Sequence, residues 1–130
     1  EISDEYLNRL QRAVPTISLP SFTALNTAFC NDVDPELVFA QPIMGLGQAG
    51  DMLIAISTSG NSKNVVAAAL TAKALGLKTI GLTGKTGGKL KSICDICICV
   101  SETETFKVQE LHLPVYHYLC AYAEKKLFTY

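Results

Sequence analysis

The sequence predicts an α/β protein, a three-layer sandwich in which helices flank a parallel sheet of about four strands. Short apolar runs bounded by turn residues recur along the 130-residue chain, and segments with helical spacing of apolar residues separate them. Strands that alternate with helices at short intervals favour parallel pairing with right-handed crossovers. The chain carries no internal repeat and no interdomain linker, so residues 1–130 are interpreted as one domain.

The elements that precede the central strand are short. Residues 16–19 are a strand candidate that Pro20 would stop, and a short helix is expected over residues 22–29. Asp34 then caps a further helix, with a proline at its first position. Pro42 falls inside that helical pattern and is expected to kink or shorten it.

The strongest pattern is the stretch 51–75, around which the other elements are arranged. An apolar run at 52–56 predicts a buried parallel strand, and an Ala- and Val-rich helical pattern follows a loop of sequence Ser-Thr-Ser-Gly-Asn-Ser at 57–62. A strand that enters a helix through a small polar loop leaves amide N–H groups and hydroxyls at the helix N-terminus, where the helix dipole favours an anion, most often phosphate. The alternative is an ordinary turn in which Ser and Asn act only as caps.

The second half of the chain continues the alternation of strands and helices. Gly76 is a natural end for the central helix, and Pro114 interrupts the pattern of the last one. The expected elements are a strand at 78–83, a turn at 84–88, a short helix at 89–93, a strand ending at 100 and a long helix at 106–128.

The composition limits the classes of function. A mass of 14.0 kDa, 48% hydrophobic residues and a mean hydropathy of +0.25 exclude a disordered chain. The net charge of −1 gives no basic field for nucleic acid, so we expect no nucleic-acid partner and an anion held by local geometry. No apolar run has the length of a membrane span and no signal peptide is visible, so no membrane partner is expected.

The cysteines favour a reducing compartment, the cytoplasm, because their number is odd and the pattern is α/β. The compact C-x-x-C-x-C spacing of three of them invites a metal-site interpretation. It lies, however, in an alternation of Ile and Cys typical of a buried strand, where only Cys97 and Cys99 share a face. Small buried hydrophobic side chains are therefore the favoured interpretation. The five cysteines are Cys30, Cys94, Cys97, Cys99 and Cys120.

Two common phosphate motifs are absent from the sequence. Gly84-Lys85-Thr86 lacks the upstream glycine of a Walker loop, and the Gly-x-Gly-x-x-Gly spelling at 45–50 precedes a strand instead of following one. The loop at 57–62 remains, with four hydroxyls in six residues and one glycine for tight curvature. Hydroxyls without a lysine suit a phosphate monoester that must leave after turnover, which indicates a small phosphorylated ligand.

Three segments together resemble the sugar isomerase (SIS) domain, and within it the phosphoheptose isomerases, which convert sedoheptulose 7-phosphate to glycero-manno-heptose 7-phosphate. They read GDMLIAISTSGNSKNV, KTIGLTGKTGGKL and VQELHLPVYHYLC, and the resemblance covers nearly the whole chain from about Thr16 onward. It implies the SIS-domain fold. It also implies phosphate-binding serines, a threonine turned towards the sugar and a sugar-contacting pair, which here are Ser57, Ser59 and Ser62, Thr58, and Asn31 with Asp32.

The two histidines lie on the predicted C-terminal helix. His112 and His117 are about 140° apart on an ideal helix, so they do not serve one site together, and periodicity alone does not choose between them. The resemblance implies that Gln109 and His117 face the sugar, that both ligate a zinc ion, and that His117 is an acid–base group. An eight-residue spacing leaves this pair about 80° apart, and Pro114 lies between them. The role of His112 stays open.

The family carries a second catalytic group, a glutamate on an N-terminal helix accompanied by a histidine ligand and preceded by a strand ending in N-G-G-S. The present sequence has no N-G-G-S, so that group is expected upstream of residue 1. Relative to the family, the single SIS domain at 1–130 is expected to be N-terminally incomplete.

Three functions follow as hypotheses. The first is a cytoplasmic phosphoheptose isomerase that works as a homo-oligomer, a tetramer, burying its long apolar helices. The second is a non-catalytic SIS module that binds a sugar phosphate or a protein partner, of the regulatory or replication-initiator-binding type. The third is another SIS isomerase or lyase acting on an amino-sugar phosphate, and the presence of Gln109 with His117 favours the first over it.

Overall fold

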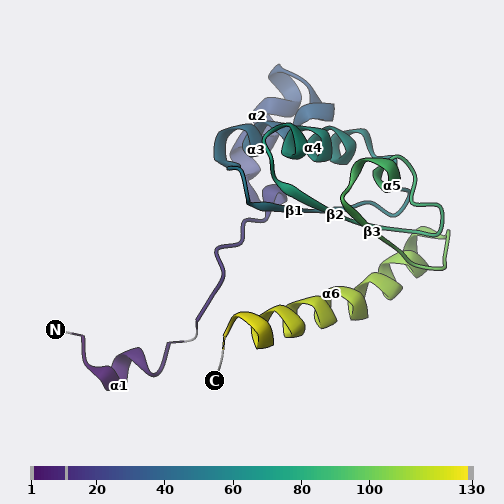
Figure 1. Cartoon of the computed structure of the whole chain (residues 1–130). Helices are drawn as coiled ribbons and strands as arrows, with labels where there is room; N and C mark the ends of the chain where they lie inside the picture. The colour runs from purple at the N-terminus through teal and green to yellow at the C-terminus, as the bar shows by residue number, and fades with distance from the viewer. Residues whose placement is uncertain (1, 11, 129–130) are drawn as a thin grey trace.

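The computed structural model, which describes residues 2–10 and 12–128, confirms an α/β fold with a parallel sheet (Figure 1). The three strands lie in the order β1-β2-β3, and both pairs are parallel. Leu53 of β1 lies opposite Thr79, and Gly81 lies opposite Cys97. The strands and the helices that connect them are β1 (Met52–Ile56), α4 (Lys63–Ala74), β2 (Lys78–Thr83), α5 (Leu90–Ile93) and β3 (Ile96–Cys99).

Figure 1 shows α2, α3 and α4 together over one face of the sheet, and α6 on the other side, running away from it. The first helix, α1, lies apart from the sheet at the far end of an extended segment. The remaining elements are α1 (Asp4–Leu7), η1 (Leu19–Ser21), α2 (Thr23–Asp32), η2 (Pro35–Leu37), α3 (Ala40–Leu46) and α6 (Thr105–Leu127).

The prediction of a strand at residues 16–19 is wrong, and the described sheet has three strands where about four were expected. Residues 16–18 are extended but exposed and have no strand beside them. The carbonyl of Ser18 instead accepts bonds from the amide and hydroxyl of Ser21, at 3.0 and 2.6 Å, which starts the turn of η1. Pro20 fits the first turn of such a helix but donates no bond to a ladder.

Prolines shape the elements before β1 and in α6. Asp34 caps as predicted, since its Oδ1 accepts the amide of Glu36 at 2.8 Å. The helix expected after it divides into η2 and α3, and Pro42 falls in the first turn of α3, where no intrahelical donor is needed. Pro114 lies inside α6, which nevertheless continues from residue 105 to residue 127.

The covered face of the sheet is packed through small residues of α4. Ala68 and Ala72 contact Ile43 and Leu77 in one cluster, and Ala69 contacts Ala55 of β1 in a second. Alanines along one helix face let the helix axis approach the sheet closely, so each buried methyl group makes many contacts. This packing fixes the start of α4 relative to the end of β1.

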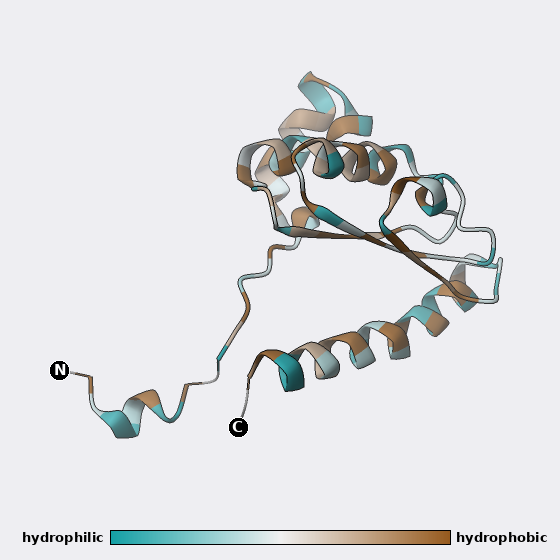
Figure 2. Ribbon diagram, viewed as in Figure 1, coloured by the Kyte–Doolittle hydropathy of each residue, from teal (hydrophilic) through white to brown (hydrophobic). Residues whose placement is uncertain are grey.

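The other face of the sheet is largely uncovered. Met52, Ile54 and Ile56 alternate along β1 and are exposed, as is Ile96 of β3. Brown, hydrophobic ribbon along the strands in Figure 2 marks the apolar character of the sheet. Only the carboxyl end of β2, at Leu82, is fully buried on this face. The third layer of the predicted sandwich is therefore present only near that end of the sheet.

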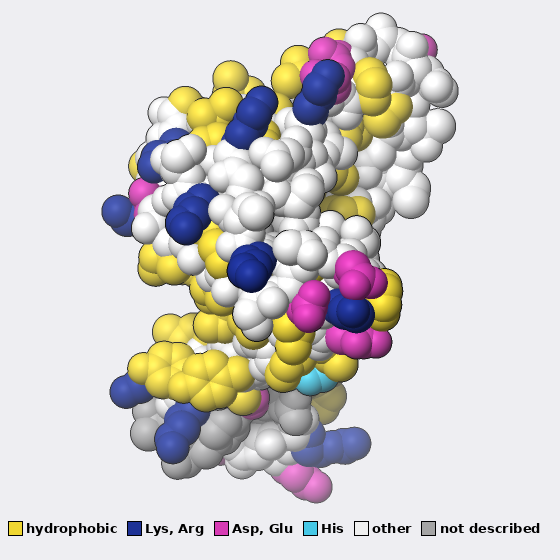
Figure 3. Space-filling model, turned by 90° about the vertical axis from the view of Figure 1, so that its right-hand side faces the viewer, with side chains coloured by type: hydrophobic (Ala, Val, Ile, Leu, Met, Phe, Trp, Pro, Cys, Tyr) yellow, Lys and Arg dark blue, Asp and Glu magenta, His cyan; other side chains and the backbone are white. Residues whose placement is uncertain are grey.

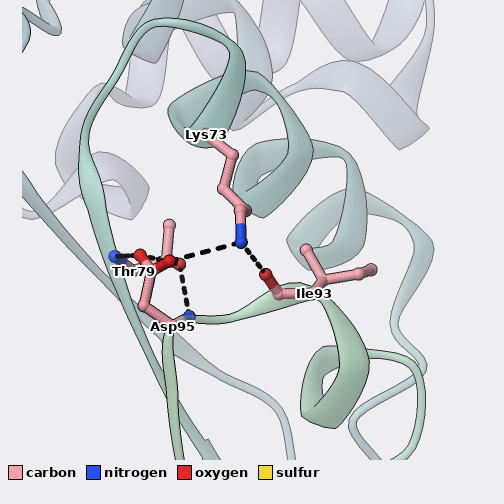
Figure 4. A network of polar contacts seen from close by, with 4 residues as sticks. All are labelled: Lys73, Thr79, Ile93 and Asp95. Atoms are coloured by element: carbon pink, nitrogen blue, oxygen red, sulfur yellow. Dashed lines mark hydrogen bonds and ion pairs between the residues drawn. The ribbon is translucent and has the colours of Figure 1, made fainter.

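The amino end of the sheet is closed by a polar network (Figure 4). Asp95, just before β3, accepts the amide of Thr79 at 2.8 Å and its hydroxyl at 2.9 Å. Lys73, near the end of α4, donates to the carbonyl of Ile93 at 2.7 Å and to Asp95 at 3.3 Å. The bonds from Thr79, then the bond from Lys73, lower the pKa of Asp95 to about 2.

The thiols on β3 share a face as predicted, with the sulfurs of Cys97 and Cys99 at 3.8 Å. The expectation that they are buried is wrong for Cys99, which is exposed because β3 is the edge strand of the sheet. Burial raises the pKa of the Cys97 thiol. All five cysteines are unpaired.

Candidate functional site

The loop at 57–62 lies where the sequence predicts it, between the carboxyl end of β1 and the N-terminus of α4. Ser57 continues the ladder through its amide, which donates to the carbonyl of Leu82 at 3.0 Å. The first amides of α4, on Lys63 and Asn64, precede any carbonyl of the helix that could accept them. Together with the dipole of this 12-residue helix, they favour a negative charge in front of the loop.

The serines of the loop are partly engaged with one another. Ser57 is only 5% exposed, and its Oγ lies 3.0 Å from the Oγ of Ser62. The Oγ of Ser59 accepts the amide of Asn61 at 3.1 Å. One hydroxyl of the 57/62 pair donates to the other, so one of their two protons remains free to donate, as does that of Ser59. Ser59 and Ser62 are exposed, so the loop offers donors to an outside acceptor.

A second loop, at 84–88, braces the first. Gly60 has a φ of +67°, and a Cβ there would collide with the carbonyl of Gly87. The carbonyl of Gly60 accepts the amide of Leu90 at 3.1 Å. Asn61 completes the clamp, because its Oδ1 accepts the amide of Lys89 at 3.0 Å. The two loops are therefore joined into one unit at the carboxyl edge of the sheet.

Gly84 joins this unit to the end of β2. Its amide donates to the carbonyl of Thr58 at 2.9 Å. A Cβ on Gly84 would meet that same carbonyl and the carbonyl of Glu102, both within 3.0 Å, and would touch Val108 of α6. The absence of a side chain thus lets the first loop, the segment before α6 and α6 itself approach one point.

The lysine at the start of α4 is paired with an acid outside the loop. Lys63 Nζ lies 2.6 Å from Glu36 Oε1 in η2. The hydrogen bond and charge of Glu36 raise the pKa of Lys63. Because this cation is already compensated, an anion at the loop would rely on amides and hydroxyls. Asn31 and Asp32 end α2 and are both exposed. The same ion pair connects the segment that follows them to the N-terminus of α4.

Gln109 and His117 lie on α6, and both are exposed. Val108 and His112 form the buried face of this helix, and His117 is nine residues beyond Val108, about 180° around the helix axis. Within the described part of the chain, no hydrogen bond joins Gln109 or His117 to the serine loop. The ring of His117 instead contacts Tyr116 edge-on, with centroids 5.1 Å apart. The structure gathers the loop residues but does not bring these two into contact with them.

The described residues do not complete a zinc site. They contain no group of three or more His, Cys, Asp or Glu side chains placed to hold a metal ion. Gln109 and His117 would supply two ligands of the four that zinc takes, and the eight-residue spacing separates them by about 12 Å along the axis of α6. Zinc ligation by this pair stays a prediction.

Two features of the site were not predicted from the sequence. The bracing loop is signalled by the paired glycines Gly87 and Gly88, which both have positive φ, but only the fold shows that they meet Ser59 and Gly60. The second is His112, which is 2% exposed and whose Nε2 lies 3.1 Å from the carbonyl of Thr83. A buried histidine on the face of Val108 is visible as a four-residue spacing, but its partner is not.

Figure 3 shows how charged and hydrophobic side chains are spread over one face of the molecule. In Figure 3, lysine and arginine side chains are scattered over the face shown, and hydrophobic side chains gather on its lower half. In the part of the chain that the structure describes, no helix is both long enough and apolar enough to span a membrane.

The chain is similar to known proteins over most of its length. The SIS domain family matches residues 11–84. A phosphoheptose isomerase of a Nitratiruptor species is 49% identical over 111 residues, which is 85% of this chain and 59% of the relative. One of Crocosphaera subtropica is 44% identical over 131 residues, 98% of this chain and 67% of the relative. The structure of phosphoheptose isomerase GmhA from Neisseria gonorrhoeae has a TM-score of 0.79 at 37% identity, over 81% of this chain and 60% of that one.

The chain thus spans about three fifths to two thirds of the proteins that it matches. The SIS match contains the whole serine loop together with β1, α4 and β2. It ends at Gly84, where the two loops meet.

Proposed function

Because the chain belongs to the SIS-domain family and, within it, to the phosphoheptose isomerases, we propose that it binds a sugar phosphate and isomerises sedoheptulose 7-phosphate to glycero-manno-heptose 7-phosphate. The observation that carries this proposal is the serine loop. It places exposed hydroxyls and free helical amides at one point, in front of α4, and the loop at 84–88 holds them there. Such a site recognises a phosphate monoester and leaves the sugar chain to extend outward.

Binding of the phosphate at the serine loop contributes to the reaction by positioning the substrate. A base removes a proton from C1 of the ketose while the C2 carbonyl oxygen takes a proton, which gives the enediol. A proton is then delivered to C2, and the hydroxyl on C1 loses its proton to form the aldehyde. Holding the phosphate end fixes C1 and C2 relative to the acid–base groups, which replaces a bimolecular encounter by an oriented one.

We assign His117 one of the acid–base roles, and Thr58, Asn31, Asp32 and Gln109 contacts with the sugar. Imidazole suits this work because its ordinary pKa lies near neutrality. The exposed position of His117 leaves its ring accessible to a substrate. The second acid–base group is proposed to come from outside residues 1–130.

Three further properties are part of the proposal. Gln109 and His117 would contribute to a zinc site that other residues complete, and a zinc ion there would supply Lewis-acid stabilisation of negative charge on oxygen. A homotetramer is supported by the apolar side chains that remain exposed on β1 and along α6. A cytoplasmic location is supported by the unpaired cysteines.

The test is turnover of sedoheptulose 7-phosphate by the full-length protein, with and without a chelator, for the wild type and His117→Ala. We expect conversion by the wild type and a loss of about 100-fold or more in kcat for His117→Ala, the scale of a lost acid–base group. Loss of activity with the chelator and recovery on adding zinc would support the metal. Glu110→Gln, an exposed change on the same helix, is the matched control and should keep its activity.

A folded wild type without turnover would overturn the isomerase proposal. If that protein still bound the sugar phosphate, the non-catalytic SIS module would be the better description. Turnover of an amino-sugar phosphate in place of the heptulose would point to the third hypothesis.

A further inference from the structure

The buried residues of the long helix α6 lie in its first half. Of its 23 residues, only Val108 and His112 are buried, and they lie one turn apart on the same face. Val108 packs where Gly84 lacks a side chain. The remaining helix carries exposed apolar side chains such as Leu113 and Tyr118. The orientation of α6 therefore depends on the contacts of these two residues.

His112 adds a directional contact to this attachment. Its Nε2 lies 3.1 Å from the carbonyl oxygen of Thr83, and a carbonyl only accepts, so Nε2 carries the hydrogen. The same oxygen accepts the amide of Val100 at 3.0 Å, so both of its lone pairs are used. One carbonyl at the end of β2 thus holds the segment after β3 and the helix α6.

The carbonyl of Thr83 is connected to the serine loop through the residue that follows it. Thr83 precedes Gly84, whose amide donates to the carbonyl of Thr58. Thr58 is therefore connected to α6 through the adjacent residues Gly84 and Thr83 and through the imidazole of His112. The other ring nitrogen of His112, Nδ1, is buried and has no hydrogen-bond partner among the described residues. The imidazole is thus held through one nitrogen.

We propose that His112 is a positioning residue of the isomerase: its Nε2–H bond to the carbonyl of Thr83 sets the orientation of α6, and with it Gln109 and His117, relative to the phosphate loop. The proposal rests on the proposed function for its catalytic consequence. His112 is proposed to make no contact with the substrate. It acts through the helix that carries the acid–base group.

Two substitutions, His112→Gln and His112→Asn, distinguish the effect of the hydrogen bond from the effect of the volume of the ring. Glutamine places an amide nitrogen near the position of Nε2 and can still donate to Thr83, whereas asparagine is one methylene shorter and reaches only the position of Nδ1. We expect His112→Gln in the full-length protein to keep kcat within about threefold of the wild type. His112→Asn should lower kcat by about tenfold, the equilibrium factor of one ordinary hydrogen bond, with KM within about twofold.

KM is expected to change less than kcat because the phosphate loop is held by α4 and the loop at 84–88, neither of which has a hydrogen bond to His112 within the described residues. A residue that only fills the core would give equal kcat values for Gln and Asn, and that result would overturn the proposal. A rise in KM without a change in kcat would also overturn it.

A readout that does not depend on activity keeps the test independent of the proposed function. Hydrogen exchange of peptides from the first turns of α6 should be about tenfold faster in His112→Asn than in His112→Gln. The wild type should also show an exchange-protected Nε2–H signal for His112 in a ¹⁵N NMR spectrum. An inactive wild type with these two results refutes the isomerase and leaves the anchoring by His112 established. A rapidly exchanging Nε2–H in the wild type would refute the anchoring itself.

Discussion

The two ends of β2 hold the same residue type in opposite situations. Thr79 at the amino end and Thr83 at the carboxyl end are both fully buried and, four residues apart, lie on one face of the strand. The hydroxyl of Thr79 is bonded to a carboxylate that Lys73 also contacts. Among the described residues, the hydroxyl of Thr83 contacts softer partners, which are the carbonyl of Gly84 at 3.2 Å and the sulfurs of Cys99 at 3.3 Å and Cys97 at 3.6 Å.

This difference distinguishes structural polar groups from functional ones. At the amino end, the amide and hydroxyl of Thr79 both donate to Asp95, and Lys73 donates to Asp95 and to the carbonyl of Ile93, so the network stabilises the junction of α4, β2 and β3. At the carboxyl end, hydroxyls of the serine loop keep protons that no acceptor in the loop takes. Donors left unused at the N-terminus of a helix favour a ligand site, so the two ends should respond differently to substitution.

Removing two hydroxyls from the serine loop should weaken binding strongly while changing stability little. For Ser59→Ala with Ser62→Ala, each lost bond to a charged phosphate is worth about 1.5–3 kcal/mol, so the affinity for a sugar phosphate should fall by about 100-fold or more. Calorimetric titration measures it. Ser18→Ala, an exposed serine far from the loop in sequence, is the control. An unchanged affinity would place the phosphate elsewhere.

Adding one methyl group at Gly60 should disrupt the contact between the two loops at the carboxyl end of the sheet and lower the stability of the fold. Gly60→Ala forces a side chain into a left-handed conformation against Gly87, at a cost of about 2–4 kcal/mol in the free energy of unfolding. Gly45 has no atom within 4 Å of its would-be Cβ, so Gly45→Ala is the matched control and should not destabilise. Urea denaturation compares them, and equal midpoints would refute the tight contact between the loops.

The two threonines of β2 offer a direct comparison. Thr79→Val removes a buried hydroxyl that both donates to Asp95 and accepts its amide, which should cost about 1–3 kcal/mol of stability. Thr83→Val removes weaker bonds and should cost less than half of that. Thermal unfolding measures both, with sugar-phosphate affinity as a second readout that Thr79→Val should leave unchanged. A larger loss for Thr83→Val would reverse the assignment of the two ends.

The amino end should also respond to acid. The pKa of Asp95 is lowered to about 2 in the folded state, below its ordinary value near 3.8. A group whose folded pKa is depressed stabilises the fold above its unfolded pKa, and that contribution is lost as the pH falls from about 4 towards 2. The effect is modest because Asp95 is partly exposed. Unfolding measured from pH 6 to pH 2 should show a smaller loss in Asp95→Asn than in the wild type; equal slopes would contradict this.

The sequence predicts those parts of the fold that depend on neighbouring residues. The strand, loop and helix at 51–75 follow from local patterns, and so does the cap at Asp34. The strand expected at 16–19 failed because a strand needs a neighbour to pair with, and none of the described strands lies beside it. The exposure of Cys99 depends on its place at the sheet edge, which is likewise a property of the whole fold.

The candidate site divides in the same way. Ser57, Ser59 and Ser62 are adjacent in sequence, so their proximity could be predicted. The clamp from Asn61 to Lys89 spans 28 residues, and the bond from His112 to Thr83 spans 29, so neither leaves a local signal. The relation of Gln109 and His117 to the loop depends on the path of α6, which periodicity alone does not determine.

The most direct test of the contrast between the two ends is a titration of the ¹⁵N-labelled protein with sedoheptulose 7-phosphate, followed through its backbone amide signals. We expect saturable shifts at residues 57–64 and 84–88, with residues 78–79 and 93–95 unmoved. Shifts centred on the amino end of the sheet, or none at millimolar ligand with a folded protein, would contradict it.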